Sequence, residues 1–220
     1  MNFYEQYPMM RPYVGKNFHG AGTPAILLIG ESHYLDEDLP QRASPEAWYS
    51  GSSATLSEYD ISFISTAKLL EDATANSFPS KTHSIYSNPF WEINEYGPRY
   101  LDYRAVADHI AFYNFFLRPA IDGDSIKHEI TSMDAAMANE AFLAHYDALK
   151  PTAVVFISML AHDYCTASLP IPVVATPHPG CAHWNSVRPK YGNKRGRDLL
   201  GDFVKTTNWP KAPIPNDRNA

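Results

Sequence analysis

The chain has 220 residues, 45% of them hydrophobic and 19% charged, with a net charge of −6, which is typical of one soluble globular domain with a sizeable core. No apolar run approaches the roughly 20 residues that a membrane span needs, and the N-terminus lacks the hydrophobic region of a signal peptide. Two cysteines, Cys165 and Cys181, are too few for a disulfide framework or a four-cysteine metal or iron–sulfur site, so we expect a cytoplasmic protein with no metal, no cofactor and no membrane partner.

The first predicted element is a buried strand over residues 25–29, with the sequence Ala-Ile-Leu-Leu-Ile. An apolar run without alternation is typical of a strand that is covered on both faces of a parallel sheet. The sequence Gly-Glu-Ser-His-Tyr follows at residues 30–34, and its glycine lets the chain turn sharply. Ligands of open α/β sheets bind in the crevice beyond the carboxyl ends of the strands. Residues 30–34 therefore predict the floor of a binding site.

Three more apolar runs predict strands, and helical spacing of apolar residues predicts the elements between them. The further strands are expected at residues 109–116, 153–157 and 172–176. Helices are expected at residues 57–73, 101–108, 132–149, 158–167 and 194–206. Residues 35–53, with one helical turn, and residues 76–98 show no clear period. We expect both to be long loops, and the second to form a lid or a binding wall.

Four short apolar runs separated by helical stretches predict a three-layer α/β/α fold with a central four-stranded parallel sheet. Residues 24–207 are expected to form its single domain. Residues 1–23 are rich in Tyr, Pro, Met and Gly, and they predict an irregular arm packed on the body. Residues 208–220 contain three prolines and little to bury, so they predict a frayed tail.

Polar residues stand at the ends of the predicted strands. Residues 30–34 follow the first strand, Asn114 interrupts the second, and His178 follows the fourth in the sequence His-Pro-Gly. The third strand ends in Ser158, which is small and leaves room. Because parallel strands put their carboxyl ends on one rim, we expect these groups to converge. Each also has a structural interpretation, namely a bridge between backbone groups for Asn114, a turn for His178, a rim or core position for His33 and a helix cap for Ser32.

A basic segment lies near the end of the predicted domain. Its five basic residues fall within ten residues that contain no acid, and they are Arg188, Lys190, Lys194, Arg195 and Arg197. The rest of the chain has 13 basic and 24 acidic residues. Screening limits the reach of that distant charge to about 8 Å at physiological salt, so the segment could hold phosphates. The alternative is a solvated basic loop.

These motifs resemble those of the uracil-DNA glycosylase superfamily. In that family the first strand leads into Gly-Gln-Asp-Pro-Tyr, Gly-Glu-Ala-Pro-Gly or Gly-x-Asn-Pro-Gly, and residues 30–34 occupy that place here. The strand-borne asparagine of the family resembles Asn114, its His-Pro-Ser motif resembles residues 178–180, and the basic helix after it resembles residues 194–200. The resemblance covers roughly residues 25–209, and it implies a parallel sheet flanked by helices and an enzyme that flips a base out of DNA.

The resemblance also implies roles for individual residues. His178 would stabilise the departing base, Asn114 would read the base edge and Tyr34 would form a wall of the pocket. The implied catalytic residues are His178, Glu31, Ser32 and His33, and the implied substrate-binding residues are Gly30, Tyr34, Asn114 and Ser158. The implied nucleic-acid-binding residues are Gly180, His183, Trp184, Asn185, Arg188, Lys190, Lys194, Arg195 and Arg197. DNA that contains uracil or a damaged base is the implied partner.

Two other hypotheses follow from the same residues. Ser32 stands where one branch of the family has an aspartate that positions water, and losing an acid–base group typically lowers the rate about 10²–10⁴-fold. The chain could therefore be a binding protein that keeps the pocket without the catalysis. Alternatively, Ser32 could be the nucleophile of a hydrolase with His178 or His33 as its base. The sequence Gly-Glu-Ser is similar to the Gly-Asp-Ser block of the SGNH esterases, although Ala175 stands where their Asp-x-x-His motif would need an aspartate.

Overall fold

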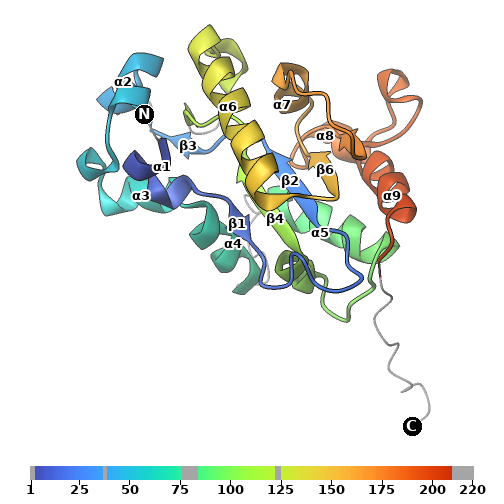
Figure 1. The fold of residues 1–220 in the computed structure, drawn as a ribbon. Coiled ribbons are helices and arrows are strands. Elements are labelled where there is room, and N and C mark those ends of the chain that lie inside the picture. The colour runs from blue at the N-terminus through green and yellow to red at the C-terminus, as the bar shows by residue number, and fades with distance from the viewer. Residues whose placement is uncertain (1–2, 37–38, 76–83, 122–124, 210–220) are drawn as a thin grey trace, which may run out of the picture.

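The central sheet has five strands within the described chain, in the order β1-β4-β2-β6-β7. The computed structural model describes residues 3–36, 39–75, 84–121 and 125–209 (Figure 1). The strands of this sheet are β1 (Tyr13–Val14), β2 (Ile26–Gly30), β4 (Ile110–Asn114), β6 (Ala153–Phe156) and β7 (Val173–Ala175). Strands β4, β2, β6 and β7 run parallel, so their carboxyl ends share one edge. A separate two-stranded parallel sheet pairs β3 (Tyr34–Leu35) with β5 (Ala120–Ile121).

The mostly parallel sheet is confirmed, but its predicted number of strands is wrong. All four predicted strands are present, and β1 adds a fifth. Tyr13 pairs with Phe112, and Val14 pairs with Ala111, in an antiparallel ladder at the sheet edge. A two-residue strand is too short to show an alternating pattern, so the sequence of the N-terminal arm gave no signal for it.

Helices lie on both faces of the sheet (Figure 1). The α-helices are α1 (Phe3–Gln6), α2 (Pro45–Ser50), α3 (Glu58–Ile64), α4 (Thr66–Ala75), α5 (Ser84–Tyr96), α6 (Ser132–Leu149), α7 (Met159–Tyr164), α8 (Ala182–Asn185) and α9 (Gly196–Thr206). The 3-10 helices are η1 (Pro8–Met10), η2 (Pro40–Arg42), η3 (Ser53–Thr55), η5 (Tyr103–His109), η6 (Ile126–His128) and η7 (Pro189–Tyr191). No helix among the described residues combines the length and apolar character that crossing a membrane requires.

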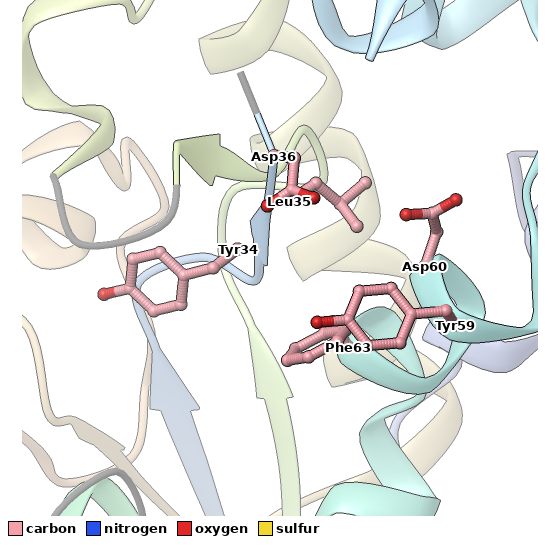
Figure 2. A pocket seen from close by; sticks show the side chains of 6 residues that line it. All are labelled: Tyr34, Leu35, Asp36, Tyr59, Asp60 and Phe63. Atoms are coloured by element: carbon pink, nitrogen blue, oxygen red, sulfur yellow. The ribbon is translucent and has the colours of Figure 1, made fainter. Parts of the chain in front are cut away.

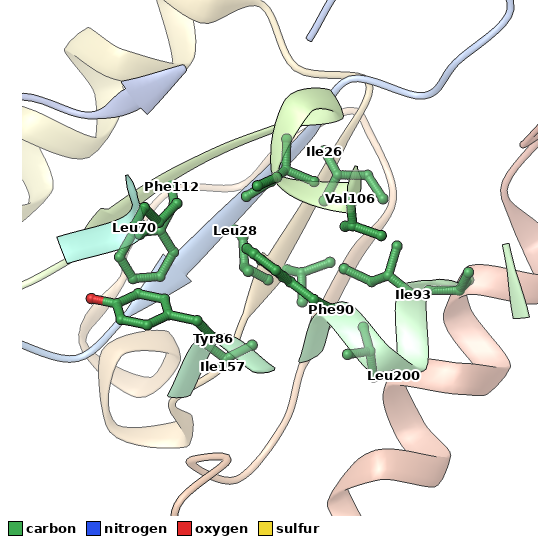
Figure 3. Packing of buried hydrophobic residues seen from close by; sticks show 14 of the residues in the cluster. Ile26, Leu28, Leu70, Tyr86, Phe90, Ile93, Val106, Phe112, Ile157 and Leu200 are labelled. Carbon is green, nitrogen blue, oxygen red and sulfur yellow. The ribbon is translucent and has the colours of Figure 1, made fainter. Parts of the chain in front are cut away.

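Alternate residues of the strands point to two different cores. Ile26 and Leu28 of β2 pack with α4, α5, η5 and α9, in a cluster that includes Phe90 and Leu200 (Figure 3). The residues between and after them, Leu27 and Ile29, pack on the other face with α6 and α7. These apolar side chains are all fully buried, which explains why the strand sequence shows no alternation.

Several predicted elements need correction. The helix predicted at residues 57–73 is two helices, because Ser65 has an extended backbone between α3 and α4. Residues 84–96 of the predicted loop at 76–98 form α5, whose buried residues Tyr86, Phe90 and Ile93 follow helical spacing around Pro89. Residues 76–83 of that loop lie outside the described residues.

Two predicted boundaries also shift. Helix α9 begins at Gly196 instead of residue 194, because Arg195 has an extended backbone and both its backbone N–H and its guanidinium donate hydrogen bonds to the Asp198 carboxylate. Trp209 was expected in a frayed tail, but its side chain is only 7% exposed. It packs closely against Gly97 in the same core as α5 and α9, so the folded domain extends at least to this residue.

Candidate functional site

Strands β2 and β4 bring Gly30 and Asn114 side by side at the carboxyl edge of the sheet. A Cβ atom on Gly30 would lie 2.1 Å from Asn114 Oδ1, so the absence of a side chain at residue 30 makes room for the asparagine amide. Asn114 is 5% exposed. Its Oδ1 atom is buried and has no hydrogen-bond partner among the described residues. Most buried polar atoms in native proteins have a partner, so this acceptor is a candidate ligand contact.

The next residue of the chain, Glu31, holds its carboxylate between two serines. Ser158 Oγ donates a hydrogen bond to Oε2, and Ser125 Oγ donates one to Oε1, each at 2.8 Å. Ser158 also caps α7 by accepting a hydrogen bond from the backbone N–H of Ala161. Since both hydroxyls come from structured segments, the Glu31 carboxylate has a fixed orientation at the strand ends.

His178 lies three residues after β7 and close to the Glu31 carboxylate. Its Nδ1 atom accepts a hydrogen bond from the Gly180 backbone N–H at 3.1 Å, so in the neutral ring Nε2 carries the proton. The Nε2 atom is buried without a partner among the described residues. Burial lowers the pKa of His178, and the nearby Glu31 carboxylate opposes that shift. The ring is therefore a neutral hydrogen-bond donor near neutral pH, and its donating nitrogen is buried.

Helix α5 fixes the loop that carries His178. Asn88 Nδ2 donates a hydrogen bond to the Pro179 carbonyl oxygen at 2.9 Å. On the same helix Tyr86 is buried, and its pKa is raised by burial and then by the nearby Tyr34 hydroxyl. Asn88 and Tyr86 were not predicted as site residues because their segment was expected to be a loop. Ser125 was not predicted either, because one serine in a polar stretch has no distinguishing pattern.

Ser32 and His33, the next two residues of the 30–34 segment, have different surroundings. Ser32 is 3% exposed, and its Oγ atom has no partner among the described residues. His33 points elsewhere, since its Nε2 atom lies 3.1 Å from Thr66 Oγ1 and its ring is also hydrogen-bonded to the Phe63 backbone. Burial lowers the pKa of His33 to about 4. The ring therefore ties the segment between β2 and β3 to α3 and α4, and its hydrogen bonds go to these helices and not to the other predicted catalytic residues.

The strand-end group is Glu31, Ser32, Asn114, Ser158 and His178. The first four are 9% exposed or less, whereas His178 and Tyr34 are half-buried. A ligand would therefore reach the group from the side of His178 and Tyr34.

An ion network fixes the segment that supplies Ser125. Arg118 is 2% exposed and binds Asp134 through Nε and Nη2, both at 2.9 Å. Arg118 and Arg42 also both bind Glu129 Oε2, in the residue that follows η6. Burial by itself would raise the pKa of Asp134, but hydrogen bonds from Arg118 and from the Thr131 cap hold that pKa below its usual range.

The basic segment is largely neutralised by acidic neighbours. Ion pairs join Lys194 to Asp202, Arg195 to Asp198 and Arg197 to Glu92. Arg188 Nε instead donates to His183 Nδ1, and the Lys190 ammonium lies over the Tyr191 ring. The phosphate-binding prediction for these five residues therefore narrows to Arg188 and Lys190.

The residues that follow His178 are only partly available to a partner. The resemblance implied that Trp184 binds nucleic acid, but this residue is 2% exposed and packs in the core with α5 and α9. The large apolar ring is more stable there than in water, so it does not project from the surface. Gly180 and Asn185 are exposed, and His183 is half-buried beside Arg188.

Within the described ranges, no three His, Cys, Asp or Glu side chains gather closely enough to hold a metal ion. A comparison of the sequence with family models and with curated proteins finds no match.

Proposed function

We propose that this chain is a uracil-DNA glycosylase-like protein, which takes up a deaminated or damaged base flipped out of DNA at the carboxyl edge of its sheet. The observation that carries the proposal is a pair of buried polar atoms there that have no partner within the described part of the chain, the acceptor Asn114 Oδ1 and the donor His178 Nε2. Their strands β4 and β7 are three strand spacings apart, or about 14 Å between backbones. Glu31 and Ser158 lie between them at the ends of β2 and β6.

The polarity of this pair favours a deaminated base. Deamination replaces an exocyclic amine with a carbonyl oxygen, and it converts the adjacent ring nitrogen from an acceptor to an N–H donor. Uracil and hypoxanthine both have this edge. The base carbonyl would accept from His178, and the ring N–H would donate to Asn114. Cytosine and adenine present the opposite polarity, so they would leave both buried protein groups unsatisfied, at about 1–3 kcal/mol each.

The same groups suit cleavage of the bond between base and sugar. As that bond breaks, its electron pair leaves with the base, and positive charge develops on the sugar. The His178 N–H would stabilise the anionic base, which is the role of an oxyanion-hole donor. The Glu31 carboxylate, held by its two serines, would face the sugar cation and orient the water that attacks it. Arg188 and Lys190 would contact the flanking phosphates.

The hypothesis of a hydrolase with Ser32 as its nucleophile has less support from the geometry than the glycosylase-like proposal. A serine nucleophile needs a base within hydrogen-bond reach. Ser32 Oγ has no hydrogen bond to either histidine, and the His33 ring is bonded to Thr66. We therefore keep the glycosylase-like proposal, with a base-binding protein that lacks turnover as its alternative.

The test is incubation of the purified chain with single-stranded and duplex oligonucleotides that contain uracil, hypoxanthine or no modified base. Abasic sites would be detected by alkaline strand cleavage. We expect product from at least one modified substrate, and a loss of about 10²–10³-fold in His178→Ala, since that variant removes one donor of the oxyanion-hole type. His162→Ala, on the exposed side of α7, is the matched control and should keep full activity.

The outcomes separate the proposal from its alternative. Thermal stabilisation by uracil or hypoxanthine without abasic product, lost in Asn114→Ala, would favour the binding protein. If the chain gave no abasic product and no base stabilised it, recognition of a base at this edge would be refuted.

A further inference from the structure

A second candidate site lies beside the strand-end group, on the other side of β3. It is a small hollow of about 30 Å³, partly open to solvent, between β3 and α3. Its lining residues are Tyr34, Leu35, Asp36, Tyr59, Asp60 and Phe63. Figure 2 shows the rings of Tyr59 and Phe63 side by side on α3, facing the β3 segment, while the ring of Tyr34 extends away from them. The hollow therefore shares Tyr34 with the entrance to the strand-end group but contains none of the five residues of that group.

The aromatic part of the hollow has no evident role in folding. Tyr59 is 66% exposed and Phe63 is 42% exposed, although α3 buries Ile64 on its inner side. The two rings are one helical turn apart, and their centroids lie 4.9 Å from each other in an edge-to-face arrangement. Exposed aromatic surface of this extent gains little from folding, so a ligand that covers the rings is a physical reason for their position.

The charged part of the hollow has a single sign. Asp36 and Asp60 both line it, and the six lining residues include no lysine or arginine. The faces of aromatic rings also carry negative potential. Asp60 uses Oδ2 to cap α3 through Ser57, whereas Asp36 is an exposed residue just after β3. Carboxylates and ring faces together repel phosphate and attract a cation that has apolar surface.

We propose that this hollow binds an organic cation, an alkylated ammonium group whose methyl or methylene surface packs on Tyr59 and Phe63 while Asp36 balances its charge. The group could belong to a free amine or to a lysine side chain of a peptide, because both present the same chemistry. The inference does not depend on the proposed glycosylase function, since the lining residues exclude Glu31, Asn114 and His178.

The test uses choline and its uncharged carbon analogue 3,3-dimethyl-1-butanol, titrated into ¹⁵N-labelled protein and followed by amide chemical shifts. We expect saturable binding of choline with a dissociation constant on the order of 1 mM, as suits an exposed cation–π site, and binding of the neutral analogue at least tenfold weaker. The shifted amides should belong to residues 34–36 and 59–63. Equal binding of the two probes, or shifts confined to other residues, would overturn the proposal.

Variants locate the interaction. Tyr59→Ala and Asp36→Asn should each weaken choline binding at least fivefold. Asp147→Asn removes the same charge from the exposed side of α6 and should leave binding unchanged, as should Leu143→Ala, which removes a 47% exposed apolar side chain there. A short peptide with one trimethylated lysine distinguishes the two sources. If the peptide binds more than tenfold more tightly than choline, the site is assigned to a peptide. If the two affinities are similar, the site is assigned to a free amine. The proposed cation site would be refuted if neither choline nor the peptide bound at a concentration 20-fold above the expected dissociation constant.

Discussion

Asn114 Oδ1 lies where a side chain on Gly30 would begin, because the two residues are directly opposite each other in β4 and β2. A Cβ on Gly30 would also come within 3.0 Å of the Phe112 ring. The glycine therefore determines both the packing of the sheet edge and the position of the amide that we assign to base recognition.

The first prediction concerns this pair. Gly30→Ala should destabilise the fold by about 1–3 kcal/mol through overpacking, and it should abolish base binding by displacing Asn114. Chemical denaturation and ligand-induced thermal shift measure the two effects. Gly22→Ala is the control, since its positive φ of 78° makes alanine unfavourable by about 1–2 kcal/mol while nothing lies within 4 Å of the new Cβ. If base binding survives Gly30→Ala, the assigned role of Asn114 is wrong.

A second prediction concerns the pH dependence of stability. Burial lowers the pKa of His33 from 6.5 to about 4, so below pH 6.5 the unfolded chain binds a proton that the folded chain does not. The free energy of unfolding should therefore decrease as the pH is lowered from about 6.5 to about 4, and His33 should contribute up to about 3 kcal/mol of that decrease. Urea denaturation from pH 4 to 8 measures the slope.

His33→Asn should flatten this slope without removing it, because burial also lowers the pKa of His145 to about 4. Thr66→Ser keeps the hydroxyl that faces His33 and should keep the slope of the parent chain. An unchanged slope in His33→Asn would show that this histidine does not titrate as its burial requires.

The third prediction compares buried and exposed ion pairs. Asp134→Asn leaves Arg118 buried with one neutral partner in place of a carboxylate, and it should destabilise the chain by about 3–5 kcal/mol. Asp202→Asn breaks exposed pairs with Lys194 and Lys205, and it should change the free energy of unfolding by less than about 1 kcal/mol. Equal effects in denaturant titrations would argue against a dominant role for the buried network.

A fourth prediction concerns the basic segment. If the chain binds DNA, Arg188→Ala and Lys190→Ala should each reduce the slope of log affinity against log salt by about 0.9, the value for one phosphate contact. Lys194→Ala should change the slope less, because Asp202 already pairs with that ammonium. Fluorescence anisotropy between 50 and 200 mM salt gives the slopes, and a larger effect at Lys194 would reverse the assignment.

The sequence was sufficient where one strong pattern decided the structure. The apolar run before Gly30 predicted a central strand, and the strand-end positions of Asn114 and Glu31 followed from parallel topology. Sequence reasoning failed where local signals conflicted with tertiary packing. Pro89 suggested a loop, yet Tyr86 and Phe90 fit one helical face and the core selects the helix.

The site could be predicted only in part for the same reason. The position of His178 after β7 could be predicted from the apolar run that precedes it. The hydrogen bond that fixes its tautomer comes from Gly180 and depends on loop geometry, so it could not be predicted. The basic segment looked free because residues 188–197 contain no acid, although Asp198 follows at once and reaches Arg195. Burial of Trp184 depends on α5 and α9, which its own neighbours in sequence do not reveal.

The short strand β1 has a consequence for the behaviour of truncated chains. It occupies the outer edge of β4, a strand made almost wholly of apolar residues. Deleting residues 1–23 would expose that edge as a template for intermolecular β-pairing. We therefore expect the N-terminal arm to suppress intermolecular β-pairing, and shortened versions should form larger species by light scattering at concentrations where the full chain does not.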